Sequence, residues 1–193
     1  MKKRILVPLL CAALLLTGCG ESASDAAEIQ RQYGLIATAA MEAEVTFHNR
    51  GEERCFTLLC DYTPRESTVT VTAPETVAGI SAVVTGEEMT LQYGGESFSV
   101  GDVGPVNPIA ALPQLLRALG GGYLLEEGRE SLEYIPCYRL VLDTDFGAAV
   151  CTVWIDEETL LPRYAEFAVD GETVLDVNML SFSCTLQEEA TKE

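Results

Sequence analysis

The chain has 193 residues, of which 48% are hydrophobic and 22% are charged, the composition of an ordinary globular protein. Acidic residues outnumber basic ones by 30 to 12, which gives a formal net charge of −18. So few cations leave no basic patch to neutralise phosphates, and the composition therefore excludes nucleic-acid binding. A chain of this length buries enough surface for one well-packed domain.

The chain begins with the pattern of an export signal. Lys2, Lys3 and Arg4 form a positive start, and residues 5–16 follow with no charge and a single proline. This apolar stretch is too short for a resident transmembrane helix.

The apolar stretch ends in Leu16-Thr17-Gly18-Cys19, which resembles the lipobox of bacterial lipoproteins. The resemblance implies that residues 1–18 are a signal peptide that is removed and that Cys19 carries lipid, including palmitate. Two acyl chains, at about 0.8 kcal/mol per buried CH₂, anchor a protein stably. We therefore expect the protein at the cell membrane, on its extracytoplasmic face or facing a periplasm. Residues 19–27 form the lipidated end and a short polar tether, and residues 28–193 form the folded domain.

The next segment predicts a helix and then a series of short strands. Apolar residues at three- and four-residue spacing predict a helix over residues 25–40, capped by Ser24 or Asp25. The spacing then changes to two, and the turn Asn49-Arg50-Gly51-Glu52 predicts a hairpin with a return strand over 55–62. Further strands are expected at 67–72, 80–84, 89–93 and 97–100.

A second helix is predicted after Asn107 as the N-cap and Pro108 as the first helical residue. It carries an apolar stripe and ends at the glycines 120–122, while Pro113 is expected to bend it or delay its start. Six strands follow at 123–127, 132–135, 137–142, 148–155, 162–169 and 173–184. About ten strands and two helices predict an α+β fold: a single large, curved antiparallel sheet, or half-barrel, with one or two helices on its concave face.

Five of the seven cysteines lie beyond Cys19, and an odd number cannot all pair. If the hairpin after Cys137 is centred on Thr144, Cys137 and Cys151 lie directly opposite each other, close enough for a disulfide. The alternative is that both are small buried hydrophobic residues. Cys55 and Cys60 fall on opposite faces of one strand and cannot bridge.

The residues offer no catalytic or metal-binding pattern. His48 is the only histidine and is expected at a strand end, in an exposed turn position. The segment Asp143 to Gly147 matches the pattern of a calcium loop only in part. Pairs of glutamates at the turns are expected to lie at solvent-exposed edges of the sheet. No metal, no cofactor and no enzymatic activity are therefore predicted.

Residues 153–163, Val-Trp-Ile-Asp-Glu-Glu-Thr-Leu-Leu-Pro-Arg, followed by the Asp170-Gly171 turn and a last strand, resemble the carboxyl half of the LolA-like superfamily. That superfamily includes the outer-membrane lipoprotein carrier, LppX lipoproteins and RseB-type regulators of envelope stress, and a spore-germination lipoprotein is a further relative. In these proteins a strand ending in Trp-x-Asp turns at Thr-x-x-Pro. The resemblance implies a half-barrel closed by helices over a hydrophobic cavity. Without it, Trp154 is most simply a core residue, and Asp156 and Thr159 are turn residues.

Two functions remain open for a membrane-anchored, non-catalytic lipoprotein of this kind. In the first, it carries a lipid-like ligand or a lipoprotein in an apolar cavity, and the residues of the lid and cavity are Leu112, Leu115, Leu116, Leu119 and Trp154. In the second, it is a regulatory module that engages an extracytoplasmic protein, as in spore germination or envelope stress. The first requires a cavity beneath the helices, and the second is compatible with a filled core.

Overall fold

The computed structural model describes residues 24–144 and 148–187. The expected signal peptide, Cys19 and most of the tether lie outside this part. None of the helices within the described ranges is long and apolar enough to cross a membrane.

Helix α2 (Asp25–Gly34) begins where the sequence predicts. The Ser24 hydroxyl accepts a hydrogen bond from the Ala27 amide at 3.2 Å, as an N-cap does. The predicted extension of this helix to residue 40 is wrong, because strand β1 (Ile36–Asn49) begins immediately after the capping residue Leu35. Strand β1 pairs along its length with strands on both sides, and these sheet contacts override the local helical spacing.

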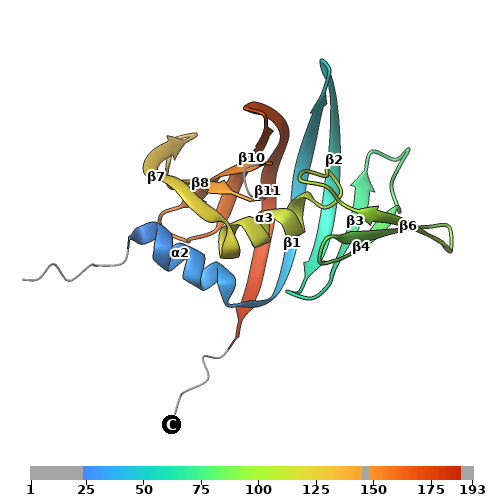
Figure 1. The fold of residues 1–193 in the computed structure, drawn as a ribbon, viewed down its shortest axis with the longest axis horizontal. Helices are drawn as coiled ribbons and strands as arrows, with labels where there is room; N and C mark the ends of the chain where they lie inside the picture. Colours follow the sequence, from blue (N-terminus) through green and yellow to red (C-terminus); the bar gives the residue numbers. More distant parts are fainter. Residues whose placement is uncertain (1–23, 145–147, 188–193) are drawn as a thin grey trace, which may run out of the picture.

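The sheet has eleven antiparallel strands in the order β6-β5-β4-β3-β2-β1-β11-β10-β9-β8-β7. Most strands pair with their neighbours in sequence, and the β1–β11 pair joins the two halves (Figure 1). The remaining bounds are β2 (Glu52–Tyr62), β3 (Ser67–Ala73), β4 (Ser81–Thr85), β5 (Glu88–Tyr93), β6 (Glu96–Asp102), β7 (Tyr123–Leu132), β8 (Ile135–Asp143), β9 (Val150–Asp156), β10 (Pro162–Val169) and β11 (Glu172–Leu186).

Helix α3 (Ala111–Gly121) begins later than predicted. The Asn107 side chain accepts hydrogen bonds from the Ile109 and Ala110 amides, so it caps a turn that precedes the helix and Ala110 takes the N-cap position. Pro113 therefore lies in the first turn of α3, where a backbone N–H has no partner within the helix.

Both helices lie across the same face of the curved sheet, which we call the inner face (Figure 1). Side chains alternate between the two faces of each strand, so one residue in two points under the helices. In β9, for example, Cys151, Val153 and Ile155 are completely buried and contribute to the core. The α+β half-barrel with helices on one face is thus confirmed.

Candidate functional site

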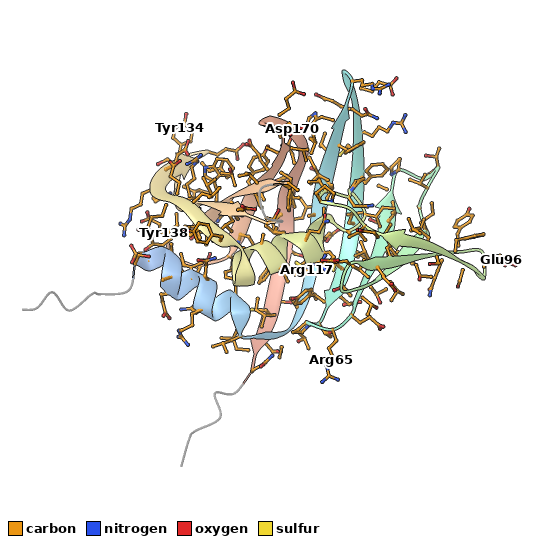
Figure 2. The ribbon with its side chains drawn as sticks, viewed as in Figure 1. Arg65, Glu96, Arg117, Tyr134, Tyr138 and Asp170 are labelled. Atoms are coloured by element: carbon orange, nitrogen blue, oxygen red, sulfur yellow. The ribbon has the colours of Figure 1, made fainter. Side chains whose placement is uncertain are left out.

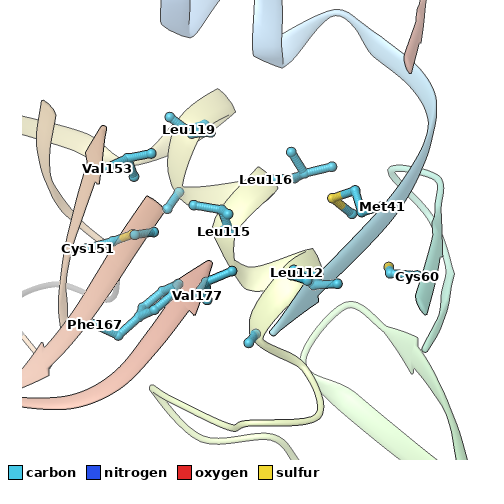
Figure 3. Close-up of a cluster of buried hydrophobic side chains, with 14 of the residues drawn as sticks. Met41, Cys60, Leu112, Leu115, Leu116, Leu119, Cys151, Val153, Phe167 and Val177 are labelled. Atoms are coloured by element: carbon cyan, nitrogen blue, oxygen red, sulfur yellow. The ribbon is translucent and has the colours of Figure 1, made fainter. Parts of the chain in front are cut away.

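The leucine stripe of α3 occupies the interior of the half-barrel. Leu112, Leu115, Leu116 and Leu119 are between 0% and 2% exposed. Figure 3 shows these side chains among Met41, Cys151, Val153, Phe167 and Val177, which come from strands in both halves of the sheet. The protein's own side chains therefore fill the space under α3 that the ligand hypothesis assigns to a bound molecule.

Trp154 does not share that space, which corrects its placement among the cavity residues. Its neighbours Val153 and Ile155 point inward, so Trp154 lies on the opposite, outer face of the sheet. There its ring packs against the Tyr164 ring on β10, with 5.5 Å between the centroids, and its indole N–H donates to Glu130 at 3.1 Å. Trp154 is half-buried in an outer-face cluster and is no part of the main core.

The Trp-x-Asp and Thr-x-x-Pro residues build a turn, as their chemistry predicts. One oxygen of Asp156 accepts hydrogen bonds from the Glu158 and Thr159 amides at 2.9 Å, and the other accepts from Arg163. These bonds, led by the Thr159 amide, lower the pKa of Asp156 to about 2. The same turn is fastened to α2, because the Tyr33 hydroxyl donates to the Leu160 carbonyl at 2.8 Å. The motif therefore performs a structural role.

The predicted register of the β8–β9 hairpin is wrong. Cys151 pairs with Leu142, while Cys137 pairs with Asp156 at the other end of the strands. The geometric reason for a Cys137–Cys151 disulfide is therefore lost, and both are free buried thiols. Burial raises the pKa of Cys151 and Cys137, which keeps both thiols protonated and unreactive.

The outer face carries a chain of polar contacts that begins on β7 and β8. Arg139 lies with its guanidinium carbon 5.9 Å from the centre of the Trp154 ring. It also forms an ion pair with Glu126 at 2.9 Å and lies 3.6 Å from Glu130, the acceptor of the Trp154 N–H. The aromatic ring thus packs beside one cation and two carboxylates.

The same face continues through β10 and β11 to β1. His48 Nε2 lies 2.7 Å from an Asp176 carboxylate oxygen, so the histidine is half-buried and paired and the expected exposed turn position is wrong. This hydrogen bond is the main cause that raises the pKa of His48. Tyr164 also contacts Asp176, and Glu166 lies beside Asp176 on the neighbouring strand.

Comparison with known proteins identifies the fold. No protein-family model matches the sequence, and no curated protein does so either. The structure resembles a DUF1329 family protein from Desulfovibrio piger with a TM-score of 0.51 and 12% identity, covering 88% of this chain and 92% of that one. The lipoprotein LppX from Mycobacterium tuberculosis is similar at a TM-score of 0.44, with 14% identity over 81% of this chain and 93% of its own.

The GerS lipoprotein complex with the CwlD amidase of Clostridioides difficile also contains a similar chain. The TM-score is 0.42 at 12% identity, covering 81% of this chain and 91% of that one. The match to the Desulfovibrio piger protein shows that the two chains share a fold, the open antiparallel half-barrel.

The half-barrel also has a surface hollow of about 650 Å³ beside α3. Its lining includes the charged residues Glu87, Asp102 and Arg117. The hollow is therefore polar, unlike the apolar cavity that a lipid would need. A second hollow of about 520 Å³ is lined by residues such as Asp61, Tyr62 and Glu66. Within the described ranges, no three His, Cys, Asp or Glu side chains are grouped as metal ligands.

Reasoning from the sequence missed the cluster of Trp154, Tyr164, Arg139 and His48 on the outer face of the sheet. A signal was present: in β9 and β10, the residues that alternate with buried positions include Trp154 and Tyr164, which are large aromatics on the solvent side. The registers of the β8–β9 and β9–β10 hairpins bring these two residues beside Arg139, and the pairing of β1 with β11, which are distant in sequence, brings His48 to the same face. Local spacing carries no information on that pairing.

Proposed function

We propose that the protein is a membrane-anchored, non-catalytic envelope lipoprotein that acts by binding a protein partner outside the cytoplasm. The observation that carries the proposal is the packing of α3, whose leucines fill the inside of the half-barrel. A folded core of this kind leaves the surface as the place of binding.

Carriage of a lipid-like ligand is the other candidate, and it would require α3 to move off the sheet. Exposing four buried leucines costs about 1.5–3 kcal/mol for each side chain. A ligand would have to replace all of these contacts with its own. This cost favours the protein-binding function.

Anchoring through Cys19 fits a stationary binding module. The cysteine follows the lipobox pattern in the sequence, and a lipid anchor keeps the protein near partners at the same membrane. The formal charge of −18 also repels the folded domain from anionic lipid, which leaves its surface accessible. The anchor is tested by metabolic labelling with palmitate, which Cys19→Ser should abolish.

Native mass spectrometry of the gently purified, full-length protein separates the two functions. We expect the mass of the lipidated chain without a second, solvent-extractable lipid in the domain. A stoichiometric extractable lipid that also appears in the Cys19→Ser variant would overturn the proposal in favour of carriage. Cross-linking in intact envelopes should yield a discrete partner adduct, and its absence would also count against protein binding.

A further inference from the structure

The outer face of the sheet carries no covering element among the residues that the structure describes. Helices α2 and α3 both pack on the inner face. Within residues 24–144 and 148–187, the outer surfaces of β1, β8, β9, β10 and β11 are therefore covered only by their own side chains. Along these strands, Trp154, Tyr164, Glu166 and Asp176 are all partly exposed.

One ring of the aromatic pair on this face, that of Trp154, already contacts a cation. The Trp154 and Tyr164 rings are inclined by 50°, so they do not cover each other's faces fully. Arg139 lies 5.9 Å from the centre of the Trp154 ring, in the range of a cation–π contact. The local geometry thus suits a guanidinium or ammonium group.

The charge around the rings is mainly negative. The outer-face carboxylates near them belong to Glu42, Glu44, Glu126, Glu130, Glu166 and Asp176. The cations on the same strands are each paired: Arg139 with Glu126, Arg163 with Asp156, Arg129 with Asp25 and His48 with Asp176. Burial and the neighbouring Asp176 raise the pKa of Glu166, as expected where carboxylates repel each other. An added positive charge would relieve this repulsion.

We propose that this outer face, centred on Trp154, Tyr164, Glu166 and Asp176, is a docking surface for a protein segment that carries arginine or lysine side chains. The inference rests on the proposed protein-binding function and specifies its site. A basic side chain of the partner packs on the aromatic rings while its charge pairs with Glu166 and Asp176. An anionic lipid surface is excluded as the occupant, because the same carboxylates repel it.

Trp154 is the only tryptophan in the chain, so its fluorescence reports on this surface alone. The full-length protein in detergent is titrated with a synthetic peptide of alternating arginine and serine, and with a glutamate–serine peptide of equal length. We expect a saturable change with the arginine peptide only, and an affinity that falls steeply with added salt. No saturable change with the arginine peptide would overturn the proposal.

Matched charge variants locate the binding. Glu166→Gln with Asp176→Asn should weaken binding of the arginine peptide about fivefold or more, since two charge pairs are lost. Glu75→Gln with Glu96→Gln removes the same charge from two exposed positions away from this face and should leave the affinity unchanged. Glu75 lies in the connection between β3 and β4, and Glu96 lies at the start of β6, at the far end of the sheet (Figure 2). Equal losses in both double variants would mean non-specific attraction and contradict the proposal. If the double variant does not fold, Glu166→Gln alone takes its place in the binding measurement, because it keeps the His48–Asp176 pair.

Photo-cross-linking in intact envelopes separates a failure of this surface from a failure of the function. A photoreactive residue is placed at Thr152 on the outer face or at Ser99 on the edge strand β6. A partner adduct at Thr152 that disappears with Glu166→Gln and Asp176→Asn supports the docking surface. Adducts at Ser99 but not at Thr152 would overturn the surface and leave protein binding intact. The absence of adducts at both positions would contradict both proposals.

Discussion

Asp156, the aspartate of the Trp-x-Asp motif, stabilises the turn that follows β9. The residue is 5% exposed, and its carboxylate accepts two backbone hydrogen bonds and pairs with Arg163 at 2.7 Å. Removing the charge would leave the Arg163 guanidinium without its carboxylate and the turn with a weaker acceptor. The residue is therefore expected to matter for folding even though it lies in no catalytic arrangement.

Asp156→Asn should lower the free energy of unfolding by about 1–3 kcal/mol, because charge-assisted hydrogen bonds are lost. The depressed pKa of about 2 means that this stabilisation is complete above pH 4 and is lost as the pH falls towards 2. Urea unfolding at pH 7 and pH 3 measures both effects. Asp170→Asn, in the exposed β10–β11 turn, is the control and should change stability by less than about 0.5 kcal/mol. Equal effects of the two substitutions would contradict this role.

His48 gives a second pH signature. Its bond to Asp176 raises the pKa of the imidazole, so the stabilisation is complete below the unfolded-state pKa, near 6.5, and is lost as the pH rises through the folded-state pKa. Since His48 is the only histidine, proton NMR can follow it directly. We expect a midpoint above 6.5 that falls in Asp176→Asn. An unchanged midpoint in that variant would show that Asp176 is not the cause.

At the scale of elements, the two helices touch through glycines. A Cβ atom on Gly120 would lie 3.1 Å from the Gly34 amide nitrogen and 3.2 Å from its Cα. These are backbone atoms that cannot rotate away. Gly120, one of the glycines predicted to stop the helix, lies in the last turn of α3 and thus also permits the α2–α3 contact.

Gly120→Ala should therefore destabilise the protein by about 1–3 kcal/mol through overpacking. Gly121→Ala is its matched control, because no atom lies within 4 Å of the added methyl group and alanine is the better helix former. Thermal unfolding should show a lower midpoint for the first variant and an equal or higher one for the second. A higher midpoint for Gly120→Ala would mean that the helices do not meet at this point.

Helix α3 as a whole is expected to behave as core. Leu115→Ala should lower the free energy of unfolding by about 2–5 kcal/mol, since the side chain is 1% exposed and its removal leaves a cavity. Leu180→Ala, at a half-exposed site on β11, should lower the free energy of unfolding much less. Chemical unfolding of both variants measures the difference. If the two losses were equally small, α3 would be a loosely held lid.

At the scale of the whole molecule, the large negative net charge affects the stability of the folded state. A net charge of −18 destabilises a compact state through self-repulsion, and salt screens that repulsion. The unfolding midpoint should therefore rise between low and moderate sodium chloride concentrations. Choline chloride should raise the midpoint as much as sodium chloride does if the effect is screening. A rise with only one of the two salts would indicate specific cation binding.

Much of the strand pattern was predictable, and the misses have identifiable causes. Strand β10 (Pro162–Val169) has the predicted bounds, because a turn motif precedes it and Asp170-Gly171 follows it. The turn at Glu133 and Tyr134, both with positive φ, was missed because neither residue is a typical turn former. The α2 boundary was missed because Ile36 and the residues after it fit a helical spacing as well as a buried strand.

Alternation of apolar residues, turn chemistry and the helix caps were sufficient by themselves to determine an α+β half-barrel with two helices, since these signals are local. Tertiary structure alone decided three further features: the filled interior, the separation of Cys137 from Cys151 and the outer-face cluster of Trp154, Tyr164 and Asp176. The filled interior depends on packing between segments distant in sequence, and the other two features depend on strand register. A shift of register moves side chains to other partners or to the other face, and no single stretch of sequence encodes it.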